Sequence, residues 1–89
     1  MPGSETAPPF RIADGLEQIR IWELVEAEVV VALECAACSR RARWTPVFMT
    51  TKLRKWSGKR LMNVALKTRC GACRSPHVRL WREREPPPR

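Results

Sequence analysis

The sequence predicts a small α+β domain in which two zinc knuckles connect short β-strands, with a helical insert between the knuckles. Three observations lead to this fold class. The four cysteines form two Cys-x-x-Cys pairs, Cys35–Cys38 and Cys70–Cys73. The chain has 89 residues, which is few for a self-sufficient hydrophobic core, so a bound metal would supply part of the stability. Short apolar segments with strand or helix periodicity lie before, between and after the two pairs.

The ends of the chain indicate a single domain with two tails. Residues 1–11 are rich in proline and small residues, and the chain closes on three prolines and an arginine. We therefore expect a disordered tail at 1–11, a domain at 12–83 and a Pro-rich disordered tail at 84–89. The N-terminus lacks the basic start and apolar core of a secretory signal, and no apolar run is long enough to span a membrane. These absences favour a cytoplasmic protein with reduced thiols.

The first half of the domain is expected to contain one helix and one strand. Asp14, followed by Glu17, resembles a capping box, and Leu16, Ile19 and Trp22 follow it at helical spacing. This pattern predicts a helix over about 14–25. The apolar run at 29–33 predicts a buried strand that leads into the first cysteine pair.

The second half predicts a hairpin strand, two short helices and a closing strand. The alternating residues 41–44 are expected to return from the first knuckle. Thr45 and Pro46 form a helix start, with threonine as N-cap and proline at the first helical position, and Gly58 is a candidate C-terminal cap. Residues 61–66 predict a second short helix, and residues 78–82 alternate as a strand that follows the second pair.

The cysteine pairs have the spacing of metal ligands. Two thiolates separated by two residues can face one ion, and four thiolates complete the tetrahedron of a structural Zn²⁺ site. The predicted ligands are Cys35, Cys38, Cys70 and Cys73. Gly71 suits the tight turn of the second knuckle because glycine accepts a positive φ. The alternative is two free or disulfide-linked redox pairs. His77, four residues after Cys73, is a candidate for a spare ligand or for a nucleic-acid contact, although a lone histidine beside proline is typical of a surface residue.

An enzyme is not expected. A catalytic zinc keeps an open coordination position and works beside a carboxylate acid or base. Residues 35–82 contain no aspartate or glutamate. We therefore expect no catalytic residues and no small-molecule substrate.

The formal net charge of +8 is divided unevenly along the chain. Residues 1–34 carry seven acidic side chains and two basic ones, whereas residues 35–82 carry thirteen basic side chains. A block of one sign indicates an anionic partner, namely nucleic acid or, with less support, an anionic membrane surface. The alternative is that the acidic N-terminal part folds back and neutralises the block. We expect nucleic acid as the partner and no membrane.

The candidate nucleic-acid contacts are the basic residues around the first knuckle, in the central turn and after the second knuckle. Arginine predominates, which favours bidentate phosphate contacts. Trp44 and Trp56 lie among these charges and are candidates for stacking on exposed bases. The basic candidates are Arg40, Arg41, Arg43, Lys52, Arg54, Lys55, Lys59, Arg60 and Arg74.

The order of these parts resembles the small four-cysteine zinc-ribbon proteins common in alphaproteobacteria. The resemblance is carried by residues 12–16, the apolar strand, the first pair, the Thr45-Pro46 helix start, the second apolar segment and residues 69–73. It implies a zinc-ribbon-like fold with the four cysteines as ligands, and it implies no activity. Zinc ribbons at large serve in transcription, translation and protein docking, which is an analogy at the level of the fold.

The sequence therefore favours a non-enzymatic structural-zinc module that binds DNA or RNA mainly through phosphates. A second hypothesis is an adaptor that docks on a larger protein complex through its acidic N-terminal helix or Trp22. A third, less favoured hypothesis is a redox or metal-delivery protein.

Overall fold

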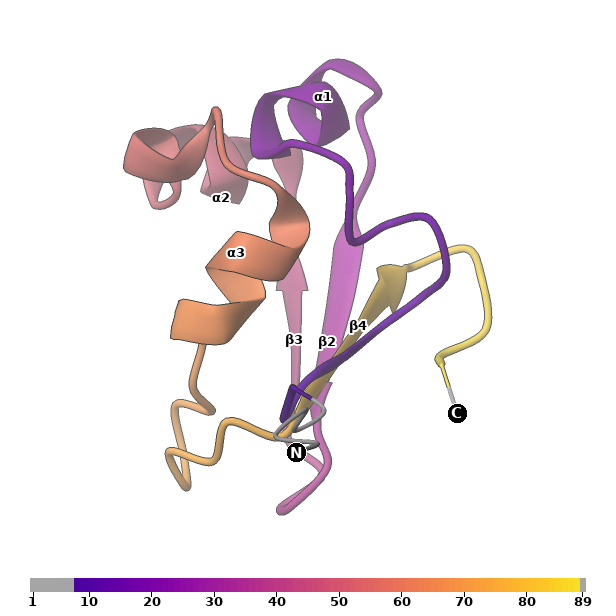
Figure 1. Cartoon of the computed structure of the whole chain (residues 1–89), viewed down its shortest axis with the longest axis vertical. Helices are drawn as coiled ribbons and strands as arrows, with labels where there is room; N and C mark the ends of the chain where they lie inside the picture. The colour runs from indigo at the N-terminus through magenta and orange to yellow at the C-terminus, as the bar shows by residue number, and fades with distance from the viewer. Residues whose placement is uncertain (1–7, 89) are drawn as a thin grey trace, which may run out of the picture.

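Four strands form one sheet, with α3 along one face and α1 and α2 at one end (Figure 1). The computed structural model describes residues 8–88. In chain order, the elements are β1 (Arg11–Ile12), α1 (Ile21–Glu26), β2 (Val31–Cys35), β3 (Arg41–Trp44), α2 (Pro46–Thr51), the 3₁₀ helix η1 (Arg54–Trp56), α3 (Leu61–Lys67) and β4 (Val78–Arg82).

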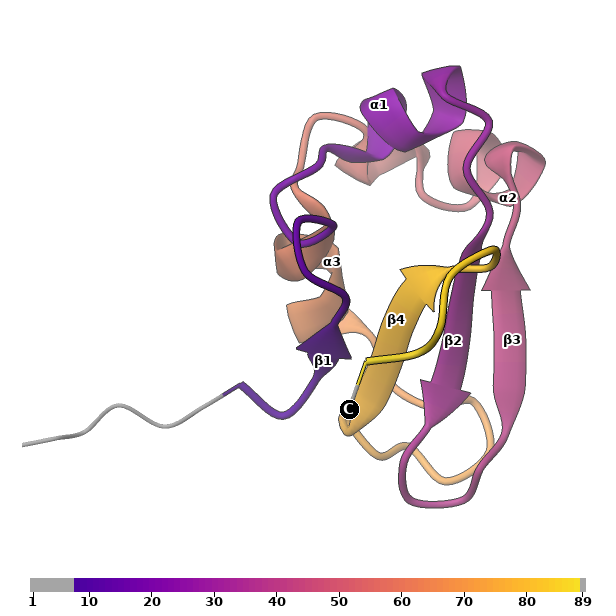
Figure 2. The ribbon, with the colours of Figure 1, turned by 90° about the vertical axis from the view of Figure 1, so that its right-hand side faces the viewer.

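The strand β2 lies between two antiparallel neighbours in a sheet of order β1-β4-β2-β3. Glu34 is opposite Arg41 of β3 on one side and opposite Arg79 of β4 on the other. The short edge strand β1 runs parallel to β4 (Figure 2). Because side chains alternate along a strand, Leu33 and Cys35 point to the helical side of the sheet and Glu34 points away from it.

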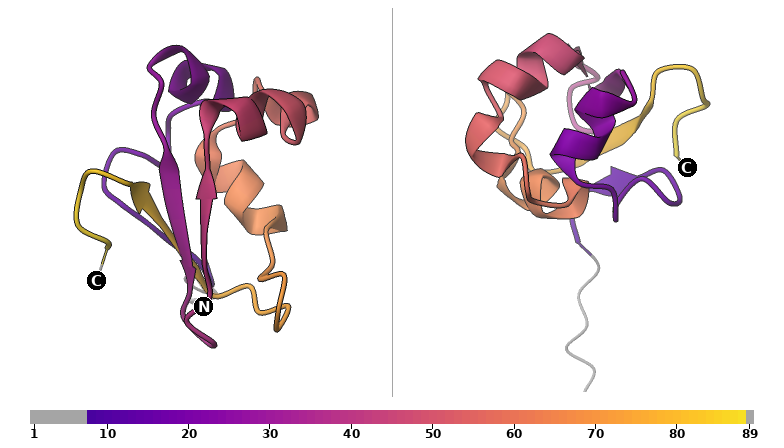
Figure 3. Two further views of the ribbon diagram at one scale, coloured as in Figure 1. Left: turned by 180° about the vertical axis from the view of Figure 1, so that it is seen from behind. Right: turned by 90° about the horizontal axis from the view of Figure 1, so that it is seen from above.

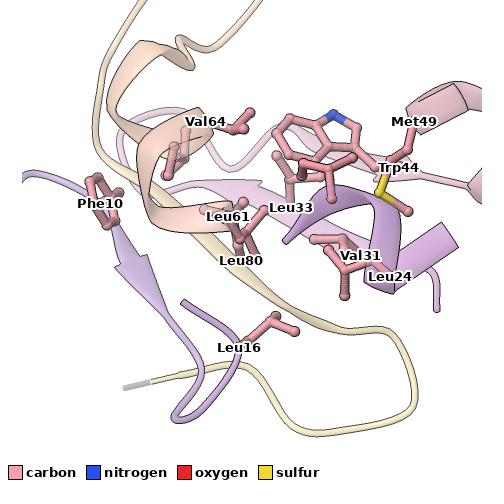
Figure 4. Packing of buried hydrophobic residues seen from close by; sticks show 13 residues of the cluster. Phe10, Leu16, Leu24, Val31, Leu33, Trp44, Met49, Leu61, Val64 and Leu80 are labelled. Carbon is pink, nitrogen blue, oxygen red and sulfur yellow. The ribbon is translucent and has the colours of Figure 1, made fainter. Parts of the chain in front are cut away.

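The hydrophobic core fills the space between the sheet and the helices (Figure 4). Burial of an aliphatic side chain of this size contributes about 1.5–3 kcal/mol, so this cluster is a main source of stability. Its largest fully buried side chains come from the three α-helices, two strands and the loop before α1: Leu16, Ile21, Leu24, Val31, Met49, Leu61 and Leu80.

The other face of the sheet carries charged pairs and one buried tryptophan. Trp81 is 8% exposed and is opposite Ala32 on this face. Glu34 binds Arg41 at 3.0 Å and lies 3.6 Å from Arg79. The C-terminal segment after β4 runs on this side, opposite α3 (Figure 1).

Several predicted elements agree with the structure. The strands at 41–44 and 78–82 have the predicted bounds, and α3 extends the predicted helix by one residue. Thr45 is the N-cap of α2, since its Oγ1 accepts a hydrogen bond of 3.1 Å from the Phe48 backbone N–H. The strand predicted at 29–33 instead runs over 31–35, because the Val29 N–H donates to the Leu24 carbonyl and closes the end of α1.

The helix predicted over 14–25 is wrong in its first part. The helix α1 begins only at Ile21, where the Glu23 carboxylate accepts a hydrogen bond of 3.0 Å from the Arg20 backbone N–H. Residues 13–19 form successive turns, and Gly15 has a φ of +86°. The carbonyls of Glu17 and Ile19 accept hydrogen bonds from the α3 backbone and so are not free to continue a helix.

Two further boundaries differ from the prediction. The helix α2 ends at Thr51, well before Gly58, which therefore does not cap it. Of the predicted N-terminal tail, residues 1–7 lie outside the described residues, but Phe10 is buried and Arg11 belongs to β1. Residues 84–88 form neither helix nor strand, and Arg89 lies outside the described part.

Among residues 8–88, no helix is both long and apolar enough to cross a membrane.

The burial of Phe10 generates a prediction. Phe10→Ala should lower the free energy of unfolding by about 3 kcal/mol, because it removes a core side chain from the edge of the sheet. Urea unfolding of the full chain measures this change. Pro9→Ala, at the exposed neighbouring position, is the control and should change the stability by less than about 0.5 kcal/mol. Equal stabilities of the two variants would show that the domain does not include Phe10.

Candidate metal centre

The four cysteines meet at one end of the sheet. Cys35 is the last residue of β2 and Cys38 lies in the β2–β3 turn, while Cys70 and Cys73 lie between α3 and β4. Both connections lie at the end of the molecule away from α1 and α2 (Figures 1 and 3). The Ala36 N–H donates to the His77 carbonyl at 2.8 Å and ties the two connections together.

The sulfur positions fit a tetrahedral metal. All four Sγ atoms lie within 4.8 Å of one another, and the Cys35–Cys73 and Cys38–Cys70 sulfur distances are both 3.5 Å. A tetrahedron with bonds of about 2.3 Å to sulfur has edges of about 3.8 Å. A disulfide would need about 2.05 Å, so the four thiols are free. The cluster can hold one metal ion with the four predicted ligands.

The two knuckles have the same backbone design. In the first, the Cys35 N–H donates to the Arg40 carbonyl at 2.8 Å, and the Cys35 carbonyl accepts from the Ser39 N–H at 2.8 Å. In the second, the Cys70 N–H donates to the Ser75 carbonyl at 3.0 Å, and the Cys70 carbonyl accepts from the Arg74 N–H at 2.9 Å. Each knuckle is thus closed by its own backbone before a metal contributes anything.

The residue after each second cysteine supplies the sharp turn. Ser39 has a φ of +67° and Arg74 a φ of +61°, and both are left-handed conformations that cost a side-chain-bearing residue about 1 kcal/mol. The predicted role of Gly71 is wrong, because its φ is not positive. The strain at Ser39 and Arg74 is maintained by the hydrogen bonds that close the knuckles.

The two buried thiols are the more acidic ones. Backbone N–H groups of Cys73 and Ala72 lower the pKa of Cys70 to about 6, and the Ala72 N–H lies 3.4 Å from the Cys70 sulfur. The Cys38 backbone N–H likewise lowers the pKa of Cys35. Backbone donors aimed at sulfur stabilise the thiolate, which is the form that binds metal.

The two exposed thiols are the less acidic ones. For each, a backbone N–H two residues later lowers the pKa, but the thiol across the site and partial burial raise it more. The result is a pKa of about 12 for Cys38 and a raised pKa for Cys73. Each close sulfur contact therefore joins one acidic thiol to one that keeps its proton, because a second thiolate so near the first is unfavourable. A cation at the centre would remove that repulsion.

His77 contributes its backbone and not its side chain to this site. The ligand cluster among the described residues contains the four cysteines alone. The His77 carbonyl accepts the hydrogen bond from the Ala36 N–H, and the His77 backbone N–H donates to the Ser75 Oγ at 3.1 Å.

The predicted basic residues do not share one face. Arg41 and Arg43 lie on the outer face of the sheet, where Glu34 and Glu83 bind them at 3.0 and 2.6 Å. Sequence reasoning missed these pairs, although a hairpin centred on the first knuckle places Glu34 opposite Arg41. Arg40 and Arg74 follow the knuckles and are exposed.

The remaining candidates form what we call the basic turn, residues 52–60, at the opposite end of the molecule from the cysteines. Its inward side chains, Leu53 and Trp56, pack against the core. Its cations are all exposed, and among the described residues none has a carboxylate within 4.0 Å: Lys52, Arg54, Lys55, Lys59 and Arg60.

The predicted stacking residues are less open than expected. Trp44 is only 8% exposed, and its ring stacks on Phe48 with centroids 6.0 Å apart. It belongs to the core and cannot offer a free face, so this prediction is wrong. Trp56 is half-buried against the core. The half-exposed tryptophan is Trp22.

Comparisons with known proteins do not assign this chain to a family, since no protein-family model, curated protein or solved structure matches it. The metal centre therefore rests on the geometry of the cysteines.

Metal removal should destabilise the protein strongly. The free energy of metal binding is added to that of folding, so a chelator should lower the stability by several kcal/mol, an amount comparable to the total stability of a small domain. Thermal unfolding with and without chelator measures the change, and Cys38→Ser should reproduce most of it. A chelated, metal-free protein with an unchanged unfolding midpoint would contradict the centre.

The affinity for metal should rise with pH. Binding needs four thiolates, and the raised pKa values of Cys38 and Cys73 mean that the metal must displace their protons in the neutral range. The affinity should therefore increase by at least about tenfold per pH unit. Below pH about 6 the thiol of Cys70 is protonated as well, so the affinity for metal falls more steeply as the pH decreases. The metal's contribution to the stability of the fold then disappears. Competition with a chelator between pH 5 and pH 8 tests this expectation, which a flat profile would refute.

Proposed function

We propose that this protein is a non-enzymatic structural-zinc module that binds DNA or RNA, mainly through phosphate contacts of the basic turn. The observation that supports this most is the set of five exposed cations within nine residues, none with a carboxylate partner among the described residues. Cations that lack internal partners are available to phosphates, and their binding releases the counterions condensed on the nucleic acid. The outer face of the sheet is a weaker candidate, because its arginines already bind Glu34 and Glu83.

Zinc is the metal that the ligand set favours. Four thiolates in a tetrahedron form a closed site for Zn²⁺, which has no preference for another geometry and no redox chemistry. In this role the ion holds the β2–β3 turn and the α3–β4 connection together. Two positive charges against four thiolates leave the centre negative, so the centre itself does not attract phosphate.

The absence of enzymatic activity is part of the proposal. Four protein ligands leave no open position on a tetrahedral metal for water or substrate. Glu34, the acidic residue beside Cys35 in the sequence, points to the other face of the sheet and is engaged by Arg41 and Arg79.

The zinc-ribbon likeness also remains a proposal. It is supported by the β2–β3 hairpin, whose turn carries the first knuckle, and by β4, which leaves the second knuckle and pairs antiparallel with β2. The parallel strand β1 and the three helices between β3 and the second knuckle are additions to that plan.

A protein adaptor is the second candidate function. It is supported by apolar side chains that remain exposed on the helices, with Trp22 at 47% and Val47 at 73%. Association with a protein through these residues would depend weakly on salt, whereas phosphate binding depends on it steeply.

Loss of the basic turn should weaken nucleic-acid binding. Replacing Arg54, Lys55 and Lys59 together by glutamine should lower the affinity at least about tenfold at 50 mM salt and reduce the slope of log K against log salt by about two. Fluorescence anisotropy with labelled oligonucleotides, single-stranded and duplex, measures both quantities on the metal-loaded protein.

A matched control removes the same charge elsewhere. Arg11, Lys67 and Arg84 are exposed, lie outside the basic turn and have no carboxylate partner among the described residues. Their triple glutamine variant should lose less than threefold in affinity. If both triple variants lose the same affinity, net charge alone governs binding. If the wild type binds no nucleic acid at low salt, the proposed function is wrong.

A further inference from the structure

Trp22 is the exposed tryptophan of the described chain. Its side chain is 47% exposed, whereas Trp44 and Trp81 are each 8% exposed and Trp56 is half-buried. Trp22 belongs to α1, the acidic helix, and for that reason the sequence pattern alone does not associate it with the cations of residues 52–60.

The fold places Trp22 beside the basic turn. The Trp22 N–H donates to the Ser57 carbonyl at 2.9 Å, and the Ile21 N–H donates to the Lys59 carbonyl at 3.0 Å. The Arg20 guanidinium adds a hydrogen bond of 2.9 Å to the Gly58 carbonyl. Seen from above, α1 lies against the chain that leads from the basic turn into α3 (Figure 3). These three bonds hold the start of α1 against the backbone of the basic turn.

An apolar groove of about 270 Å³ lies next to this indole. Its apolar lining comes from Ile21, Trp22, Val25 and Met49, and Arg54 and Glu26 also line it. The volume is below that of pockets for drug-sized ligands, so the groove suits one planar ring better than the several side chains of a docked helix. Arg54, as a lining residue, brings positive charge to the groove.

We propose that Trp22 is a stacking platform for an unpaired base, and that the nucleic acid held by the basic turn is single-stranded. This inference rests on the proposed function. Phosphates would contact the cations of residues 52–60, and a base would turn into the groove and stack on the indole. Bases inside a duplex are stacked on each other and cannot enter the groove, whereas bases of a single strand are free to do so. The carboxylate of Glu26 repels phosphate, so the backbone should follow the Arg54 side of the groove.

Charge complementarity decides between a base and an apolar protein segment as the occupant. Arg54 and Ser57 of the basic turn line the groove. The basic turn carries five exposed cations without carboxylate partners in the described chain, which is a surface that a polyanion complements and an apolar helix does not. An aromatic platform beside a cationic track is the usual arrangement for sequence-tolerant binding of single strands.

The test compares a thymidine 12-mer with a duplex of the same length, using metal-loaded wild type, Trp22→Ala and Trp22→Phe. Trp22→Ala should bind the single strand at least tenfold more weakly with an unchanged salt slope, and should bind the duplex within twofold of the wild type. Trp22→Phe should recover much of the loss, because phenylalanine also stacks. Binding of the 12-mer should quench the tryptophan fluorescence of the wild type and leave that of Trp22→Phe nearly unchanged.

Leu66→Ala is the matched control, since Leu66 is 48% exposed on α3 and does not line the groove. Circular dichroism and metal content confirm that each variant is folded. If Trp22→Ala binds the 12-mer as well as Leu66→Ala does, the stacking proposal is wrong. If the basic-turn variant still loses affinity in that case, the proposed function stands without it. If the wild type binds neither oligonucleotide, both proposals fail and a protein partner for the groove is favoured.

Discussion

The structure depends on four sulfur atoms being brought within 4.8 Å of one another. Four thiolates this close repel each other strongly, and protons or a cation must compensate for that repulsion. The alternation of acidic and less acidic thiols shows the compensation by protons. A divalent metal would compensate all four at once and would join the end of β2 to the connection between α3 and β4. Because β2 is a central strand, this junction also aligns the sheet.

The remainder of the fold is stabilised by a separate hydrophobic cluster. Its members lie between the sheet and the helices, from Phe10 at the edge of the sheet to Met49 of α2 (Figure 4). The four cysteines of the candidate metal centre lie at one end of this cluster and the basic turn lies at the other. A metal bound by these cysteines would support the fold from a distance, and the proposed nucleic-acid surface includes none of the four cysteines. On this arrangement, substitutions in the basic turn change binding without disturbing the knuckles.

Local patterns were the most predictable part of the sequence. The strands at 41–44 and 78–82, the Thr45 cap and the four clustered cysteines follow from alternation, from N-cap chemistry and from Cys-x-x-Cys spacing, all of which act over a few residues. The helix predicted to start at Asp14 does not form there, because the carbonyls of Glu17 and Ile19 accept hydrogen bonds from backbone N–H groups of α3, which is far away in the sequence. Burial of Phe10 and of Trp44 likewise depends on packing against distant elements, which no local pattern reports.

The sequence by itself determined the two cysteine pairs, the order of the longer helices and strands and the number of positive charges, because each is a property of neighbouring residues. It did not reveal the short strand β1 or the 3₁₀ helix η1. Only the tertiary structure decided which charges remain available. The strand register places Glu34 of β2 opposite Arg41 of β3, where the two side chains form an ion pair, and the turn after β4 brings Glu83 to Arg43. The cations of residues 52–60 have no such partners in the described chain. The tertiary structure also places Trp22, a residue of the acidic helix α1, beside the basic turn through backbone hydrogen bonds. Side-chain neutralisation and exposure are relations between distant segments, so they are set only when the chain has folded.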